Sequence, residues 1–137
     1  MADLSVGTVT KIYGGQRVET AGGNYTQGQA AVRHLVDGLW YPAVNDTAEH
    51  AHSYGIFLTS GAAQSAAVIQ TSGAIDLGVA GTLGQGYWIS ANAGGLCPST
   101  DLTSGKYATF MMIYVGQIGL AQHAYLLRPL ASDIAHA

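Results

Sequence analysis

The chain has 137 residues, a formal net charge of -3 at pH 7 and only 9% charged side chains. Nucleic-acid binding needs clustered Lys and Arg to neutralise phosphates, whereas the five basic residues of this chain are spread along its whole length. The single cysteine excludes an intrachain disulfide, and no apolar run approaches the ~20 residues of a membrane-spanning helix. We therefore expect one domain with neither a nucleic-acid nor a membrane partner.

The low fraction of charged residues also limits how the surface of the protein can be made. An ordinary soluble domain has about 25% charged residues, so this chain has few charges with which to cover its exterior. A surface that is covered by copies of the same chain or by another protein needs fewer charges. The composition therefore predicts a protein whose surface is largely covered, when it functions, by copies of itself or by another protein. The first residues lack the pattern of a signal peptide, so we expect synthesis in the cytoplasm.

Residues 1–28 are the first region in chain order. Alternating residues from Leu4 to Ile12 predict an extended segment, and glycine pairs at 14–15 and 22–23 predict turns. We expect these residues to form an extended N-terminal arm over a neighbouring subunit, or else to be part of the main domain.

Residues 29–130 carry the pattern of the main domain, and 131–137 that of a loose C-terminal tail. An Asp37-Gly38 turn between two β-forming runs predicts a hairpin, and residues 45–53 favour a short helical turn. Strands are predicted at residues 29–37, 39–44, 54–60, 65–71, 74–80, 87–91, 106–116 and 124–130. This spacing predicts a single-domain antiparallel β-sandwich, jelly-roll-like in its connectivity. The strand at 106–116 is apolar on both faces, so both faces must be covered.

Few residues in the sequence indicate a catalytic, nucleotide-binding or metal-binding site. Glycines at 81–86 lack the order of a nucleotide-binding loop, and no nucleophile motif is present. His50 and His52 are the best metal candidates, but no further His or Cys lies near them in the sequence to complete a site. We therefore expect no enzymatic activity, no cofactor and no metal.

Aromatic and apolar side chains on predicted strands are more often core or interface than a ligand platform. The candidates for an interface are Leu4, Val6, Trp40, Tyr41, Tyr87, Trp88, Phe110, Met112 and Tyr114.

Several short stretches of the sequence together form a recognisable set of motifs. They are Asp37-Gly38-Leu39 with Tyr41-Pro42-Ala43, then Tyr54-Gly55-Ile56, then GQGYWISANAGGLCPSTDL from Gly84, and the glycine-punctuated run from Val115 to Ala121. In these motifs the chain resembles the head decoration, or capsid cement, proteins of tailed bacteriophages.

The resemblance implies a structural role without turnover. Such a protein is made in the host cytoplasm and binds the outer capsid surface of the virion, where it bridges and stabilises subunits of the major capsid protein. It implies a homodimer or a homotrimer, with many copies acting together.

Two alternatives stay open at this point. A phage tail or fibre module could bind host surface glycans through Trp40, Tyr41, Tyr87 or Trp88. A small metal-dependent β-barrel enzyme of the cupin type could use His50 and His52.

Overall fold

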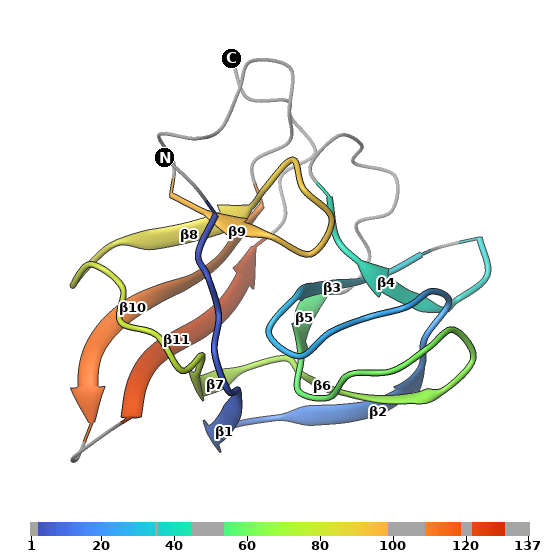
Figure 1. Ribbon diagram of the computed structural model, residues 1–137, viewed down its shortest axis with the longest axis horizontal. Coiled ribbons are helices and arrows are strands. Elements are labelled where there is room, and N and C mark those ends of the chain that lie inside the picture. The colour runs from blue at the N-terminus through green and yellow to red at the C-terminus, as the bar shows by residue number, and fades with distance from the viewer. Residues whose placement is uncertain (1–2, 35, 45–53, 99–108, 119–121, 131–137) are drawn as a thin grey trace.

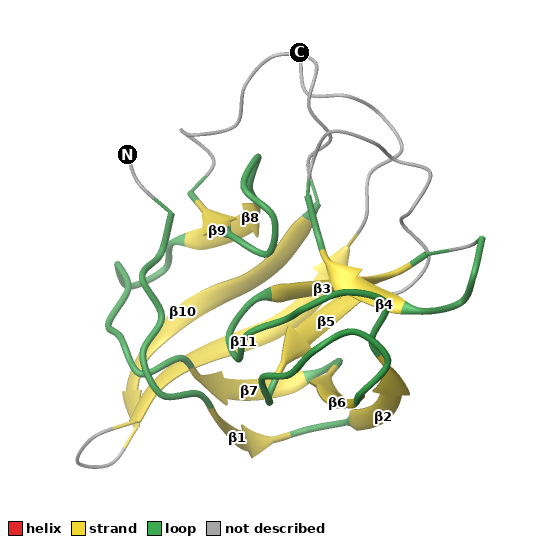
Figure 2. Cartoon of the chain, turned by 45° about the vertical axis from the view of Figure 1, so that its right-hand side comes forward, coloured by secondary structure: helices red, strands yellow, loops and turns green. Residues whose placement is uncertain are grey.

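Two antiparallel sheets face each other in the computed structural model, which describes residues 3–34, 36–44, 54–98, 109–118 and 122–130 (Figure 1). No helix occurs among these residues, as the cartoon in Figure 2 shows. The predicted all-β sandwich is thus confirmed, while its jelly-roll connectivity stays a prediction. The helical turn predicted at 45–53 and the tail at 131–137 lie outside the described residues.

Each sheet has its own strand order. The first sheet runs β1 (Thr10–Tyr13), β7 (Gly73–Asp76), β11 (Gln122–Leu130), β10 (Phe110–Ile118), β8 (Gly86–Ile89) and β9 (Leu96–Cys97). The second runs β2 (Gln16–Thr20), β6 (Ala66–Gln70), β5 (Tyr54–Phe57), β3 (Ala30–Arg33) and β4 (Trp40–Pro42). β2 and β9 are strands that the sequence did not predict.

Apolar residues are buried on both faces of the second sheet. Along β3, Ala30 and Val32 join the core cluster that the two sheets share, whereas Ala31 between them joins a second cluster. Successive side chains of a strand point to opposite faces, so the second cluster lies on the far side of this sheet. Tyr25 covers it, stacked on Phe57 at 4.6 Å between ring centroids.

A two-stranded ribbon links the sheets at a sharp corner. β1 passes into β2 where β6 passes into β7, and the two segments stay paired across the bend, seen along the lower margin of Figure 1. Gly14 and Gly73 both have positive φ there, 128° and 87°. A Cβ on Gly14 would lie 2.0 Å from the Ser72 carbonyl oxygen, so only glycine fits.

Gln70 stabilises the inside of this corner. Its side chain is fully buried, and its Nε2 donates to the carbonyl oxygens of Tyr13, Ser72 and Ala74 at 3.0, 2.8 and 2.9 Å. The buried amide of Gln70 thereby provides a hydrogen-bond donor to three carbonyl groups at the bend.

The N-terminal residues lie against the sandwich. Leu4 N donates to Leu96 O and Gly7 N donates to Leu77 O, each at 2.8 Å, before β1 and β2 join the two sheets. Of the two interpretations of residues 1–28, these pairings match the one that makes them part of the sandwich.

Candidate interaction surface

Four of the nine interface candidates are buried by their own chain. Trp40, Tyr87, Met112 and Tyr114 are between 0% and 6% exposed. Trp40 belongs to the cluster on the far side of the second sheet, and the other three belong to the shared core. Their side chains complete the interior of the chain's own fold, so they offer no surface to a partner and the interface prediction is corrected at these positions.

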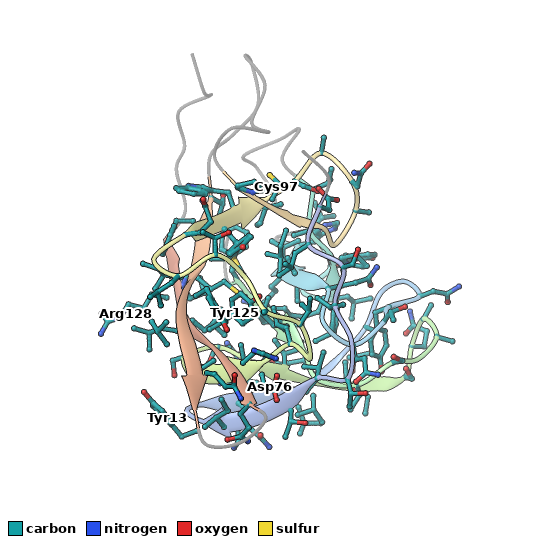
Figure 3. All side chains as sticks on the ribbon, turned by 60° about the vertical axis from the view of Figure 1, so that its left-hand side comes forward. Tyr13, Asp76, Cys97, Tyr125 and Arg128 are labelled. Carbon is teal, nitrogen blue, oxygen red and sulfur yellow. The ribbon has the colours of Figure 1, made fainter. Side chains whose placement is uncertain are left out.

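The three buried tyrosines of the shared core form one group. The Tyr114 ring lies 4.9 Å from the Tyr125 ring, which in turn lies 5.8 Å from Tyr87. The Tyr125 hydroxyl donates to the Val79 carbonyl, and Figure 3 shows Tyr125 deep between the sheets. Burial, with a further contribution from the neighbouring tyrosines, raises the pKa of Tyr125 well above its usual range. This group is structural packing rather than a surface.

Leu4 and Val6 are partly buried and pack against the shared core from the N-terminal segment. Val6 lies so close to Gly28 that a Cβ there would be 2.6 Å from the Val6 Cγ2. These two side chains therefore hold the N-terminal segment against the core of its own chain.

Tyr41, Trp88 and Phe110 are half-buried. Tyr41 stacks on His34 with 3.9 Å between ring centroids, and its hydroxyl donates to the Asp37 carboxylate. That hydrogen bond lowers the pKa of Asp37 and raises the pKa of Tyr41. Trp88 meets Phe110 edge to face at 5.2 Å on the other sheet.

The four aromatic residues of the glycan alternative do not share a platform. Trp40 and Tyr87 are buried, and Tyr41 and Trp88 lie on different sheets. A sugar ring needs neighbouring exposed aromatic faces, which these four positions do not supply together.

Two of the four sheet edges are covered by the chain itself. At β9, Leu4 N donates to Leu96 O, so the N-terminal segment runs beside this edge. At β4, Ala21 forms a parallel bridge to Trp40, and Gly22 N donates to the Trp40 carbonyl oxygen at 2.8 Å. Neither edge is available along these residues.

The other two edges, β1 and β2, have no strand on their outer side among the described residues. They follow each other through the corner and form one line, Thr10–Thr20, which we call the open edge. Tyr13 and Val18 on it are 57% and 65% exposed, and Figure 3 shows Tyr13 directed away from the molecule. Natural proteins usually block such edges, because unpaired N–H and C=O groups invite another strand.

The open edge carries charges of both signs. On β2, the Arg17 guanidinium lies 3.0 Å from the Glu19 carboxylate and 5.7 Å from the centre of the Trp40 ring. The spacing of two residues puts both charges on one face of the strand, with Val18 on the other. Sequence reasoning assigned this region to contacts with a neighbour but did not identify β2, since its polar residues carry no burial pattern.

Two small cavities flank the N-terminal segment. One of about 210 Å³ is lined by Asp3, Leu4, Ser5, Thr82, Gln85, Tyr87 and Pro98, and the other is of about 190 Å³. The Asp3 carboxylate accepts from the Ser90 hydroxyl and the Asn92 amide, at 2.9 and 3.0 Å, so it holds the segment in place. Neither cavity gathers the groups of a catalytic site.

The described ranges hold no group of three or more His, Cys, Asp or Glu residues that could bind a metal ion. His50 and His52 lie outside those ranges, and Cys97 is buried. The expectations of no metal, no cofactor and no enzymatic activity therefore stay predictions.

Within the same ranges, no helix combines the length and apolar character required to cross a membrane. Compared with known proteins, the chain matches no family model, no curated protein and no solved structure.

Proposed function

We propose that this protein is a structural component of a phage virion, which binds the outer capsid surface as a homo-oligomer and bridges subunits of the major capsid protein. The observation that carries the proposal is the open edge. The chain covers β9 and β4 but leaves β1 and β2 free in one continuous line, among the residues that the structure describes. A free sheet edge in a charge-poor protein is suited to being covered by a partner.

The physics of the edge fits a bridging role. An extended partner segment that adds to a sheet edge gains main-chain hydrogen bonds along its length, and exposed side chains such as Tyr13 add apolar contact. Each contact can be modest, since many symmetric copies on one shell act together. A structural role of this kind requires no catalytic group.

The experiment compares virions with and without this protein. Particles that lack it should release their DNA at a lower temperature and after milder osmotic shock, and purified protein added back should restore stability. Equal stability of the two kinds of particle would contradict the proposal.

A pair of matched variants locates the shell contact. Tyr13→Asp introduces a negative charge on the open edge. Leu83→Asp, the control, introduces the same charge at a 73% exposed position away from that edge. We expect Tyr13→Asp to weaken binding to empty shells in a sedimentation assay, by about tenfold or more, and Leu83→Asp to bind as the unmodified protein does. Equal binding of both variants would place the contact elsewhere.

Copy number separates this proposal from the tail or fibre alternative. A cement protein should be present in hundreds of copies per particle, and a fibre module in tens at most. The cupin-type enzyme alternative requires a bound metal at His50 and His52, which native mass spectrometry would detect.

A further inference from the structure

The sequence of β2 is self-complementary when the strand is paired with itself. We propose that two copies of this chain join through β2, antiparallel, about a twofold axis at Val18. This inference deepens the proposed function, because it names the self-contact of the homo-oligomer. Its test uses the purified chain without any capsid, so the dimer and the capsid role can fail separately.

The backbone of β2 is arranged for such a contact. Thr71 N donates to Gly15 O and Ala21 N donates to Ser65 O, so residues 15 and 21 bond toward β6 at the two ends of the strand. Bonding direction alternates along an antiparallel strand, so residues 17 and 19 also face β6, while 16, 18 and 20 direct their N–H and C=O groups outward. Val18 is therefore placed to exchange two hydrogen bonds with Val18 of the second copy.

The side chains complement each other in the same register. With the axis at Val18, Arg17 lies opposite Glu19 of the second copy, and Glu19 lies opposite its Arg17. Residues directly opposite in an antiparallel pair point to the same face, and opposite charges there are favourable. Within one chain these two side chains already share a face, 3.0 Å apart, so the dimer collects four charges of alternating sign.

The charges also exclude the neighbouring registers. An axis at Arg17 would oppose two arginines, and an axis at Glu19 would oppose two glutamates, and like charges directly opposite are destabilising. Val18, 65% exposed in one chain, becomes partly covered when it pairs with Val18 of the second copy. The register about Val18 is thus the one that satisfies both the backbone and the charges.

The contact is short, because Ala21 already bridges to Trp40 and ends the free part of the edge. An interface of five residues per chain belongs to the small, weakly associating class. Such a dimer is strengthened on a symmetric shell, where neighbouring copies are held at high local concentration.

Analytical ultracentrifugation of the purified full chain tests the proposal. The unmodified protein should shift from monomer to dimer with rising concentration, below about 1 mM. Arg17→Glu and Glu19→Arg each oppose like charges twice in the dimer, so each should weaken it by about tenfold or more. Lys11→Glu makes a matched charge change on β1, outside the pairing, and should leave the dimer unchanged.

A mixture of the two single variants gives the decisive result. Arg17→Glu chains carry two acidic residues on β2 and Glu19→Arg chains carry two basic ones, so together they should form a heterodimer although neither dimerises well alone. The double variant R17E/E19R reverses both charges and should dimerise like the unmodified chain. Variants that had merely unfolded could give neither result.

Three outcomes would overturn the proposal. They are an unmodified chain that stays monomeric up to about 1 mM, single variants that dimerise as tightly as the unmodified chain, and a mixture that forms no heterodimer.

Discussion

The four edges of the two sheets fall into two kinds, covered and open. β9 and β4 are covered by residues of the same chain, Leu4 and Ala21 with Gly22, whereas β1 and β2, which follow each other through the corner, have no strand on their outer side among the described residues. At each covered edge a passing segment donates a backbone hydrogen bond to the edge strand, from Leu4 N to Leu96 O at β9 and from Gly22 N to Trp40 O at β4. This difference is the basis of our proposal that the open edge pairs with another chain.

The variant with the largest expected effect disrupts the corner through which β1 continues into β2. Gly73→Ala would place a Cβ 2.2 Å from the Tyr13 carbonyl oxygen, at a φ of 87°. We expect a loss of about 3 kcal/mol or more in the free energy of unfolding, measured in urea. Gly84→Ala is the control, because φ is 80° there and no atom lies within 4 Å, so backbone strain alone should cost about 1 kcal/mol. Equal losses would show that the close packing of the corner is unimportant.

The next variant keeps the corner glycines and removes the hydrogen bonds inside the bend. Gln70→Leu leaves the carbonyls of Tyr13, Ser72 and Ala74 without this donor, so we expect a loss of about 2 to 3 kcal/mol in urea unfolding. Gln16 lies opposite Gln70 in the ladder but is exposed. Gln16→Leu should therefore change stability by less than about 0.5 kcal/mol. A large loss at Gln16 would contradict this account.

A third variant opens a covered edge. Asp3→Ala removes the acceptor for Ser90 and Asn92, and with it the anchor of the segment that covers β9. We expect a loss of about 1 kcal/mol and faster hydrogen exchange at the Leu4 amide. Ser5→Ala, at an exposed neighbouring position, should change neither value. Unaltered exchange in Asp3→Ala would mean that this edge stays covered without the anchor.

The smallest effect concerns the hairpin that presents β4. The Tyr41 hydroxyl is the main cause of the lowered pKa of Asp37, so in Tyr41→Phe that pKa should rise toward its usual value of 3.8 in an NMR titration. A lowered pKa in the folded state stabilises the fold above the usual pKa, and this stabilisation is lost as the pH falls through the folded-state pKa. The variant should therefore show a weaker loss of stability in acid. An unchanged Asp37 titration would rule out this hydrogen bond in solution.

Local turn chemistry was predictable from the sequence. The Asp37-Gly38 turn joins β3 to β4 as expected, with a φ of 72° at Gly38 and the Asp37 Oδ1 accepting from Leu39 N at 2.9 Å. The expectation that both faces of the 106–116 strand are covered is met at Met111 and Met112, which are fully buried, but Val115 is 47% exposed.

The arrangement of the core was not predictable in the same way. Strand alternation separates two faces but does not say that the second sheet buries both of them, so Trp40 was assigned to an interface although it completes the cluster on the far side of that sheet. β2 gave no signal, because its five residues are polar or exposed and its partner β6 lies some fifty residues away in the chain. Long-range pairing of this kind is invisible to periodicity.

The corner at Gly14 and Gly73 also determines how the molecule would respond to force. β1 with β2, and β6 with β7, each pass from one sheet into the other as uninterrupted backbone. A pull on a neighbour bound at the open edge is therefore carried between the sheets by covalent bonds and by ladder hydrogen bonds, not by side-chain packing alone. The two sheets should yield together, as a single mechanical unit, when the chain is stretched from that edge.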